Sequence, residues 1–340
     1  MPTSFRTEWT LPKGKFLLNH QQNILLMGSC FSENIGHRLQ KYKFASLVNP
    51  FGILFNPASI TQALELMDQR EKFTEQDLLF FEEKWLSLFH HTQFSHTVRS
   101  HCLSAINSAF DKGKSLFKKL DCIIITLGTA FVYEYKKTHT LVANCHKIPA
   151  QEFNRKLLDL TEICAYLERA IIVLKKQNPA IKILFTVSPV RHWKDGVLDN
   201  QKSKSLLHLA VRHFSEQDDT IDYFPAYELM MDDLRDYRFY EADMLHPNKM
   251  AVDYIWEKFT ASHTSDKTQI LLTKLQKINR SLQHRPRHIG TKKHQDFLQN
   301  LWLNLEVLQK EYAFLNLEKE RIDLKAKISQ AQQGFFDDRV

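Results

Sequence analysis

Three short apolar runs, each closed by a glycine or a serine, constrain the fold of this chain more than any other feature. They are residues 23–27 before Gly28, residues 122–127 before Gly128, and residues 181–187 before Ser188. Near-continuous apolar runs of this length are typical of strands that are buried on both faces of a parallel sheet. Each run therefore predicts a central strand, and the small residue after it predicts a turn into a loop.

Helical patterns fill the spaces between these runs. Apolar residues recur at a spacing near 3.6 over residues 33–42, 58–67, 104–120, 157–176 and 202–214. A further helix should follow Pro247, which suits a first helical turn, and shorter strands should lie near residues 45–48 and 221–224. Strands that alternate with helices predict a three-layer α/β/α sandwich with a mostly parallel sheet.

The pattern changes near residue 262. Two long helical stretches follow, at residues 268–281 and 293–328, and His284-Arg285-Pro286-Arg287 separates them. The second carries an apolar stripe: Leu301, Leu305, Leu308, Tyr312, Leu315, Ile322 and Leu324. We therefore expect a catalytic domain over residues 1–262 and a C-terminal helical extension over residues 263–340. The extension can form a hairpin on the core or on a second subunit, so a homo-oligomer through these helices is one expected assembly.

Hydropathy and cysteine usage both point to the cytoplasm. No apolar run approaches the roughly 18–20 residues that span a membrane, and residues 1–17 lack an apolar signal core. The five cysteines are scattered, with no C-x-x-C pair, which fits reduced thiols better than a disulfide framework or a zinc site. We expect a cytoplasmic protein without a membrane partner.

The net charge of +7 raises the question of a nucleic-acid partner. Most of this charge lies in residues 261–340, where 14 Lys and Arg against 9 Asp and Glu leave +5. A basic helical extension can bind phosphates. The simpler interpretation is a solvated helix face, so nucleic acid is not the expected partner.

Motifs for metals and nucleotide phosphates are absent from the sequence. Sixteen histidines invite a metal hypothesis, but neither H-E-x-x-H nor a Cys/His ligand spacing occurs. No glycine-rich phosphate loop of either common type occurs. We expect no metal and no cofactor.

Chemistry should instead lie in the turn Gly28-Ser29-Cys30, at the carboxyl end of the first strand. Backbone N–H groups and the dipole of the following helix favour negative charge at such a turn. They would lower the pKa of a thiol and stabilise an oxyanion. The structural alternative is a serine that caps the helix, followed by a buried cysteine.

The segment Asp243-Met244-Leu245-His246-Pro247-Asn248 favours the functional interpretation of that turn. Asp243 can accept the Nδ1–H of His246, which leaves Nε2 free as a general base. A lone Asp-x-x-His is common and means little. Late in a doubly wound domain, and followed by Pro-Asn and a helix, it is a more specific signal.

Together these segments resemble the SGNH/GDSL hydrolase superfamily. Within it, Gly28-Ser29-Cys30-Phe31-Ser32 looks like the signature of the GSCFA-domain proteins. Further stretches are similar to that group: Asn49-Pro50-Phe51-Gly52-Ile53 through Asn56-Pro57, Leu127-Gly128-Thr129-Ala130, and Ser188-Pro189-Val190-Arg191-His192. The resemblance extends from about residue 20 to residue 260, and the His284-Arg285-Pro286 stretch is consistent with it.

The resemblance implies a hydrolase or acyl-transfer fold with a Ser-His-Asp type triad. An ungapped overlay on the superfamily's Gly-Asp-Ser block puts Ser29 on the aspartate and Cys30 on the nucleophilic serine. A thiolate paired with histidine is a competent nucleophile, so the register favours Cys30. Ser29 remains the alternative, with Cys30 packed beneath it.

The resemblance also implies an oxyanion hole built from the nucleophile's N–H, a glycine N–H and an asparagine. Gly52 is the candidate glycine. The third block is Gly128-Thr129-Ala130, so an alanine stands where the asparagine is expected. One lost donor costs about 10²–10³-fold in rate. The candidates to replace it are Thr129, Asn56 and His91.

Several further residues can contact substrate. Arg191 and His192 follow the strand at 181–187, at the end of the sheet where an anionic or sugar group would bind. Asn200, Ser203 and Lys204 can do likewise, unless Asn200 only caps the next helix. His90 and His91 follow an aromatic run and either line the cleft or form a semi-buried pair. Residues 237–240 precede Asp243 and should form a wall of the site.

The leading hypothesis is an esterase or acyltransferase that acts on an O-acyl ester, of a small molecule or a glycan. His246 would activate Cys30 or Ser29, and an acyl-enzyme would form. The alternative is a protein that kept the fold and lost hydrolysis, and that serves as a binding or scaffolding module.

Overall fold

The computed structural model describes residues 8–337, with side chains described for residues 8–332. Within these residues the chain forms two compact units. An α/β domain contains residues 8–18, 22–40 and 44–264. A helical unit contains residues 19–21, 41–43 and 265–337.

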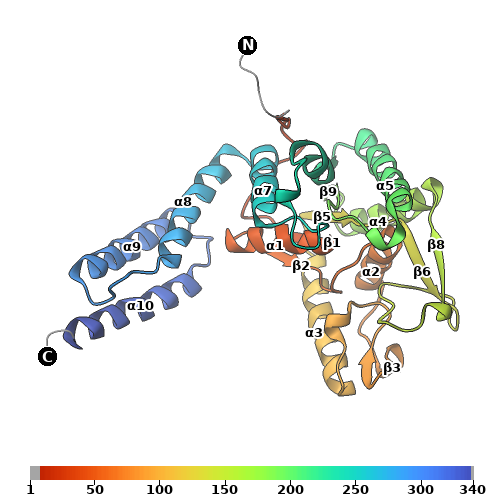
Figure 1. Cartoon of the computed structure of the whole chain (residues 1–340), viewed down its shortest axis with the longest axis horizontal. Coiled ribbons are helices and arrows are strands. Elements are labelled where there is room, and N and C mark those ends of the chain that lie inside the picture. Colours follow the sequence, from red (N-terminus) through yellow and green to blue (C-terminus); the bar gives the residue numbers. More distant parts are fainter. Residues whose placement is uncertain (1–7, 338–340) are drawn as a thin grey trace, which may run out of the picture. The chain divides into compact units, whose positions relative to one another are not determined.

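A five-stranded parallel sheet forms the centre of the α/β domain (Figure 1). Its strands, in spatial order, are β10 (Ile221–Tyr223), β9 (Lys182–Val187), β5 (Cys122–Leu127), β1 (Ile24–Gly28) and β2 (Ser46–Val48). All neighbours pair in parallel. The predicted α/β class is confirmed, and the three apolar runs form the three central strands, as expected.

The register of the central strands brings their carboxyl ends to one level. Gly28 pairs with Thr126, and Thr126 pairs with Thr186. The loops after β1, β5 and β9 therefore leave the sheet side by side. In open α/β sheets this carboxyl edge is where ligands bind.

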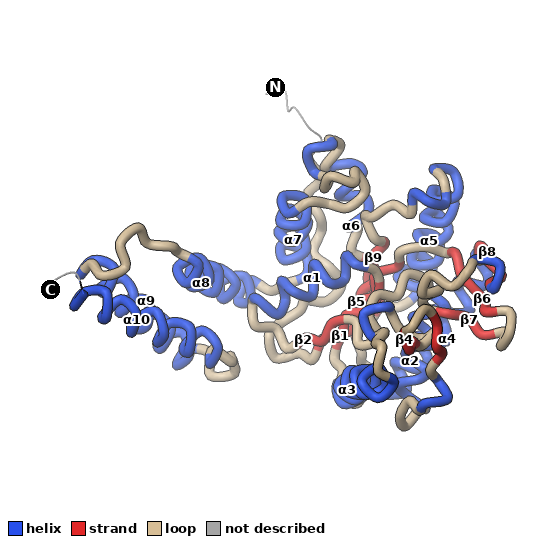
Figure 2. Tube along the Cα trace, turned by 60° about the horizontal axis from the view of Figure 1, so that its bottom comes forward, coloured by secondary structure: helices blue, strands red, loops and turns tan. Residues whose placement is uncertain are grey.

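Six helices of the α/β domain flank the sheet. They are α1 (Cys30–Lys41), α2 (Pro57–Gln69), α3 (Arg99–Phe117), α4 (Leu160–Gln177), α5 (Val197–Gln217) and α7 (Lys249–His263). Figure 2 shows α1 and α7 on the opposite side of the strands from α2 and α3. The three layers of the predicted sandwich are thus present.

The strands bury both of their faces. Leu25, Ile123 and Ile183 belong to a large core that they share with α2, α3, α4 and α5. Alternate residues such as Ile24 and Leu184 are fully buried outside that core, on the other face. Because successive strand side chains point to opposite faces, burial at every position requires a cover on both sides.

Two small antiparallel sheets were not predicted. One is the hairpin of β3 (Leu79–Phe81) and β4 (Lys84–Leu86), and the other contains β6 (Phe131–Tyr135), β7 (Thr140–Val142) and β8 (Phe153–Leu157). These strands are three to five residues long and mostly half-exposed. Strands this short give too few residues for a periodic pattern to be recognised in the sequence, and β8 is also largely polar. A short helix α6 (Ala226–Glu228) and a π-helical turn (Leu229–Asp233) were also missed.

The helical unit contains three helices, α8 (Asp266–Gln283), α9 (Lys292–Glu311) and α10 (Glu318–Asp337). C-terminal helices were expected, but the single stretch over 293–328 was wrong. Residues 312–317 form a turn in which Leu315 and Leu317 are buried, and the Asn316 side chain accepts the Glu318 amide at 3.2 Å. The break resets the helical phase, so Ile322 is 62% exposed instead of lying in the apolar stripe.

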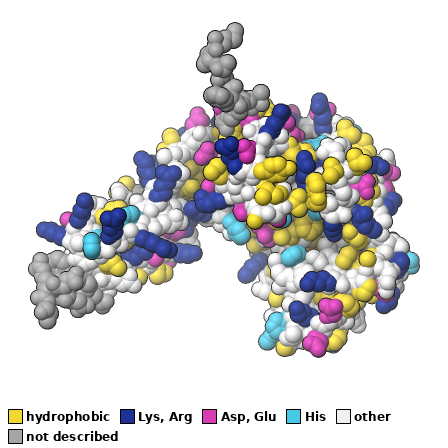
Figure 3. All heavy atoms as spheres, viewed as in Figure 1, with side chains coloured by type: hydrophobic (Ala, Val, Ile, Leu, Met, Phe, Trp, Pro, Cys, Tyr) yellow, Lys and Arg dark blue, Asp and Glu magenta, His cyan; other side chains and the backbone are white. Residues whose placement is uncertain are grey.

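The surface of the helical unit is polar and basic. On the face that Figure 3 shows, lysine and arginine side chains are spread over the helices and do not form one dense patch. Among the described residues, no helix is both long enough and apolar enough to span a membrane.

A substitution at Leu305 tests the packing of the core of the helical unit. It is fully buried in a leucine cluster, whereas Leu303 on the same helix is 60% exposed. Leu305→Ala should lower the free energy of unfolding by about 2–5 kcal/mol, because it removes buried methyl groups and leaves a cavity. Leu303→Ala is the matched control and should change it by less than about 0.5 kcal/mol. Urea unfolding followed by circular dichroism measures both, and equal effects would contradict this packing.

Candidate active site

The turn after β1 is held tightly against the neighbouring strand. Gly28 has φ of 140°, and its amide donates to the Asn49 side chain at 3.0 Å. A Cβ at Gly28 would lie 2.2 Å from the carbonyl oxygen of Thr126. Only glycine therefore allows β1 to turn into α1 at this level of the sheet.

Ser29 and Cys30 have different surroundings. Ser29 is 1% exposed, and its hydroxyl accepts the amide of Phe31 at 3.3 Å. Cys30 is the first residue of α1 and is partly exposed. Ser29 is thus more deeply buried than Cys30.

Several groups set the pKa of the Cys30 thiol. Burial raises it most, and the carboxylate of Glu33 raises it further. The backbone amides of Phe31 and Cys30 lower it, and so does the ammonium of Lys204. These are the effects expected of a helix N-terminus and a nearby cation on a thiolate. The net direction is upward, so burial outweighs the favourable groups.

Asp243 and His246 form a hydrogen-bonded pair. The Nδ1 of His246 lies 2.6 Å from Oδ2 of Asp243. The other carboxylate oxygen accepts the amides of Leu245 and His246, both at 2.9 Å. These backbone hydrogen bonds, together with the imidazole, lower the pKa of Asp243 to about 2. The carboxylate therefore stays ionised and orients the ring, and both side chains are about half exposed.

Pro247 lies outside the helix that follows. Asn248 is the N-cap of α7, with its side-chain oxygen accepting the Ala251 amide at 3.1 Å. Pro247 is buried and forms a bridge with Tyr240. The expectation of Pro247 in the first helical turn was therefore wrong. Its role is to fix the loop against Tyr240, so that His246 is presented just before α7.

The structure brings Asp243 to His246 but does not hydrogen-bond His246 to the thiol. Within the described chain, the sulfur of Cys30 makes no hydrogen bond to another side chain. His192 lies beside Gly128 and is close enough to His246 to be affected by its charge. Its Nε2 would be 3.2 Å from a Cβ at Gly128, and its pKa falls to about 4, because of burial first and then nearby cations and His246.

Most of the candidate oxyanion donors already have acceptors. The amide of Gly52 donates to the Asn49 carbonyl at 2.7 Å. The amides of Gly128 and Thr129 both donate to the carbonyl of Phe55, at 2.7 and 2.9 Å. The Thr129 hydroxyl accepts the Phe131 amide at 3.1 Å. These groups hold the loops together and would have to rearrange to reach a ligand.

Asn56 and His91 differ in what they face. Asn56 caps α2 with Oδ1, which accepts the Ser59 amide at 2.8 Å. Together with Thr129 and His192, it lines a cavity of about 420 Å³. His91 packs against Gly52, and its Nδ1 accepts the Gln93 amide at 3.4 Å. Asn56 is thus the one of these two that lines the cavity.

His90 is a core residue. It is fully buried, its ring stacks on Phe51 with centroids 4.9 Å apart, and Nδ1 lies 3.0 Å from the Ser87 hydroxyl. Burial lowers its pKa to about 3. A neutral ring in an aromatic cluster fits the semi-buried alternative for His90 and not a role in the cleft.

A cavity of about 460 Å³ lies beside Asp243. It is lined by Arg191 and by aromatic and apolar side chains, among them Trp193, Tyr237, Tyr240 and Met244. Tyr237 and Tyr240 were expected as a wall near Asp243, and both line this cavity. The Nε of Arg191 is buried and has no hydrogen-bond partner among the described residues.

Three polar residues on α5 hold the loops at the carboxyl edge. The Asn200 side chain accepts the His192 amide at 2.9 Å, and the Ser203 hydroxyl accepts the Ala130 amide at 2.7 Å. The Lys204 ammonium donates to the Ser188 carbonyl at 2.7 Å. All three side chains are buried. Asn200 does not cap α5, because the helix already begins at Val197.

The burial of Lys204 was not predicted from the sequence. The Lys204 side chain is completely buried, with an exposed fraction of 0%. It forms no ion pair with a carboxylate within the described chain. Burial lowers its pKa to about 7. Ser203 and Lys204 follow Asn200 by three and four residues, so all three lie on one face of the helix. This spacing was the sequence signal that the three side chains point in the same direction.

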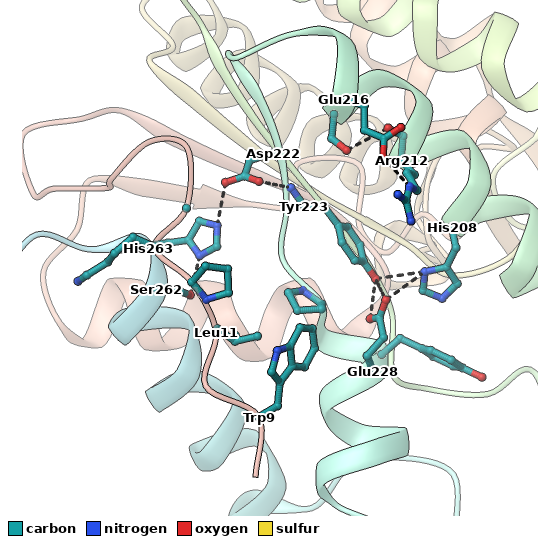
Figure 4. A pocket seen from close by; sticks show the side chains of 16 residues that line it. Trp9, Leu11, His208, Arg212, Glu216, Asp222, Tyr223, Glu228, Ser262 and His263 are labelled. Carbon is teal, nitrogen blue, oxygen red and sulfur yellow. Dashed lines mark hydrogen bonds and ion pairs between the residues drawn. The ribbon is translucent and has the colours of Figure 1, made fainter. Parts of the chain in front are cut away.

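A further cavity, of about 580 Å³, lies at the edge strand β10 (Figure 4). It contains Ser262, His263 and Asp222, the residue types of a hydrolytic triad. The Ser262 hydroxyl lies 2.8 Å from Nδ1 of His263 but donates to the Lys258 carbonyl, also at 2.8 Å, and is 2% exposed. The Asp222 carboxylate accepts the Lys15 amide at 2.7 Å. The cluster anchors the N-terminal segment and offers no accessible nucleophile.

Two family models match this chain. The model described as "GSCFA family" matches residues 23–259, and the one described as "GSCFA domain protein, C-terminal domain" matches residues 275–330. No curated protein matches it. One solved structure with similarity is a carbohydrate esterase family 3 protein from Talaromyces cellulolyticus, at 7% identity and a TM-score of 0.35, covering 74% of this chain and 97% of that chain. At that TM-score the likeness supports no statement about function.

Gly28→Ala should destabilise the domain by about 2–5 kcal/mol, because it adds backbone strain and a clash with the Thr126 carbonyl. Gly196 is the matched control. It also has positive φ, of 81°, but a Cβ there meets nothing within 4 Å. Gly196→Ala should cost about 1–3 kcal/mol of backbone strain, without a steric clash. Thermal unfolding of both variants tests this, and a Gly28→Ala effect no larger than that of Gly196→Ala would show that the turn relaxes freely.

Proposed function

The chain belongs to the GSCFA family, and we propose that it is an SGNH-type esterase or acyltransferase that acts on O-acyl esters through Cys30, His246 and Asp243. Within this proposal Cys30 is the nucleophile, His246 the acid–base group, and Asp243 the residue that orients the imidazole. No metal or cofactor takes part in it.

The observation that carries the proposal is the 2.6 Å contact between Asp243 and Nδ1 of His246. An ionised carboxylate that holds Nδ1–H leaves Nε2 as the basic nitrogen, and Nε2 has no hydrogen bond within the described chain. The pair lies in the loop before α7, beside a cavity large enough for a small ligand. An exposed ring of this kind is suited to proton exchange.

The choice of Cys30 over Ser29 is supported by burial and hydrogen bonding. Ser29 is 1% exposed, and its hydroxyl accepts a backbone amide. Cys30 is partly exposed at the first position of a helix, where N–H groups have no acceptor within the helix. The amide of Cys30 itself would stabilise the oxyanion of a tetrahedral intermediate, whereas the amides of Phe31 and Ser32 already donate to Ser29.

The proposed reaction starts from the Cys30 thiolate and a His246 imidazolium. Sulfur attacks the acyl carbonyl, the bond from carbon to the alcohol oxygen breaks, and His246 gives its proton to the leaving alkoxide. A thioester and neutral His246 result. Water or an acceptor hydroxyl then gives its proton to His246 and attacks the thioester, and the thiolate leaves as the product acid or ester forms. Hydrolysis and transfer differ only in this second nucleophile.

In this proposal the alcohol part of the substrate binds in the cavity beside Asp243, which Asp243 lines but Cys30, His246 and Asn56 do not. Trp193, Tyr237 and Tyr240 offer flat apolar faces, and Arg191 offers a cation whose Nε is unpaired within the described chain. A sugar ring with O-acyl groups fits flat faces edged by polar donors. We therefore propose a carbohydrate ester as the substrate class, with Arg191 bound to a polar or anionic group of it.

The alternative is a protein of this fold without hydrolysis, which binds a partner or a ligand. It is favoured by Ala130, which stands in place of the expected oxyanion asparagine, and by the absence of a hydrogen bond from His246 to Cys30 in the described chain. An acyl probe directed at thiols separates the two. Labelling of Cys30 that depends on His246 supports the enzyme, and no labelling supports the binding protein.

Hydrolysis of a short-chain p-nitrophenyl ester tests the assignment of the nucleophile. We expect Cys30→Ala and His246→Ala each to lower kcat/KM by about 10³-fold or more, because each removes a group that acts in bond making. Ser29→Ala should lose less than about tenfold, since it removes only a buried helix-start hydrogen bond.

Activity that survives in Cys30→Ala but not in Ser29→Ala would reverse the choice of nucleophile. Activity in His246→Ala equal to that of the unaltered protein would remove the proposed mechanism. Circular dichroism of each variant is the control for folding.

Asn56 is our candidate for the missing oxyanion donor. Its Oδ1 is held by the Ser59 amide, so Nδ2 is the group left to face a ligand. Asn56→Asp keeps the helix cap and removes the donor. It should lower kcat about 10²-fold or more with little change in Tm.

Asn56→Ala removes both the donor and the cap, so it should lose kcat to a similar extent and also about 1 kcal/mol of stability. If Asn56→Asp keeps full activity, Asn56 acts only as a cap, and the oxyanion donor must be sought elsewhere.

A further inference from the structure

The loop after β9 separates two cavities. One is the cavity beside Asp243, and the other is the cavity of about 420 Å³ that Asn56 lines, which we call the Asn56 cavity. Consecutive side chains of the loop open alternately into the two. Arg191 and Trp193 line the first cavity, and His192 and Lys194 line the second. A single segment of chain is therefore a wall that both cavities share.

The Asn56 cavity also reaches the turn that carries Cys30. The amide of Leu54 donates to the carbonyl of Gly28 at 3.0 Å. The next two residues, Phe55 and Asn56, line the cavity. The cavity thus begins two residues beyond a hydrogen bond to the turn, although Cys30 itself does not line it in the described part of the chain.

The inner surface of the Asn56 cavity is largely apolar. Its walls come from the carboxyl edge of the central sheet and from the small sheet of β6, β7 and β8. The apolar side chains among them are Phe55, Phe131, Val142, Ile148 and Phe153. Small-molecule pockets span about 300–1,000 Å³, so this cavity can hold a ligand. Removal of apolar surface from water is favourable, and such walls therefore suit an apolar group.

Several polar side chains around the Asn56 cavity already have partners in the protein. The Thr129 hydroxyl accepts a backbone amide at 3.1 Å, and the Asn144 side chain accepts another at 2.8 Å. The Asp195 side chain is 4% exposed and pairs with Arg155 at 2.6 Å. With these groups committed, the cavity offers a ligand mainly apolar surface, together with Nδ2 of Asn56 at the edge of the sheet.

The loop at residues 143–148 holds one wall of the Asn56 cavity in a fixed conformation. His146 and Lys147 have positive φ, of 51° and 63°. Positive φ is strained in residues with a side chain, so surrounding contacts must maintain it. The buried ring of His146 supplies one such contact, because its Nε2 donates to the Ser87 carbonyl at 2.9 Å. A ligand would therefore bind a wall that is already ordered, which lowers the cost of binding.

We propose that the Asn56 cavity is the acyl pocket, and that it selects apolar acyl groups longer than acetyl. This inference rests on the proposed function and names the acyl group of its substrate. The carbonyl carbon of an ester joins an alcohol part to an acyl part, and the two cavities share one wall. With the alcohol part beside Asp243, the acyl chain enters the other cavity and the carbonyl oxygen lies near Asn56. The methyl group of an acetyl ester would leave most of this cavity unfilled.

Hydrolysis of p-nitrophenyl acetate and p-nitrophenyl octanoate tests the selectivity. We expect kcat/KM to be about tenfold or more higher for octanoate, because each buried CH₂ can contribute up to about fourfold. A value for acetate equal to or above that for octanoate would overturn the proposal.

Ala150→Trp tests whether the Asn56 cavity is the source of that preference. Ala150 is exposed at the rim and lines the cavity, so an indole there should fill part of it and lower the ratio of octanoate to acetate by about tenfold. Gln151→Trp is the matched control, since Gln151 is the next residue, is also exposed and lies outside the described lining. It should keep the ratio. Equal ratios in the two variants would place the acyl chain elsewhere.

Cys145 reports binding without any catalysis. Its partly exposed thiol lines the Asn56 cavity, and because burial raises the pKa of this thiol to about 11, its alkylation by iodoacetamide is followed at alkaline pH. Saturating octanoate should slow the reaction by about twofold or more in the unaltered protein, and acetate at the same concentration should not. Cys164 lies outside the described lining and in a different tryptic peptide, so it is the internal control.

The protection of Cys145 needs no variant, so it tests the cavity even if Ala150→Trp does not fold. Protection by octanoate without hydrolysis of either ester would overturn the proposed function and leave the cavity as a site for apolar acyl groups. Ester hydrolysis without protection, and without a preference for octanoate, would overturn the acyl pocket and leave the proposed function standing.

Discussion

The parallel register of β1, β5 and β9 is the constraint on which the rest of the α/β domain depends. Gly28, Thr126 and Thr186 stand level across the three strands, so three loops leave the sheet at one edge. The approach is closest at Gly28, where any side chain would meet the Thr126 carbonyl. Because α1 begins two residues later, this single backbone constraint decides where the N–H groups of its first turn and the Cys30 thiol lie.

Buried polar side chains of α5 hold the loops after β5 and β9 in place. Ser203 bonds to the backbone of the loop after β5, and Asn200 and Lys204 both bond to the backbone of the loop after β9. Hydrogen bonds of this kind are worth little in net stability, but leaving any one group unpaired in the interior is costly. They therefore specify a unique arrangement. Lys204 differs from the other two because the Ser188 carbonyl accepts its hydrogen bond but does not neutralise its charge.

Sequence reasoning predicted the features that depend on apolar periodicity and on the residue types found in turns. The central strands, the helices between them, and the hydrogen bond from His246 to Asp243 all follow from local spacing, since each depends on residues close in the chain. The small antiparallel sheets did not follow, because strands such as β8 are polar and short. The turn at residues 312–317 was missed because Leu315 and Leu317 keep the apolar pattern while the helix stops. Lys204 was named only as one of several ligand-binding candidates. Its burial depends on how α5 packs over the sheet.

Two clusters in this domain show that residue types alone do not identify a site. Ser262, His263 and Asp222 have the composition of a triad, yet the serine is buried and donates to its own helix, and the aspartate anchors a backbone amide. Cys30, His246 and Asp243 are less closely joined, but the thiol is partly exposed at a helix start, and the imidazole is half exposed with one nitrogen committed to a carboxylate. A nucleophile must be reached by substrate and a base must exchange protons with solvent. Access, more than the completeness of the hydrogen-bonded chain, therefore separates the candidate active site from a structural anchor made of similar parts.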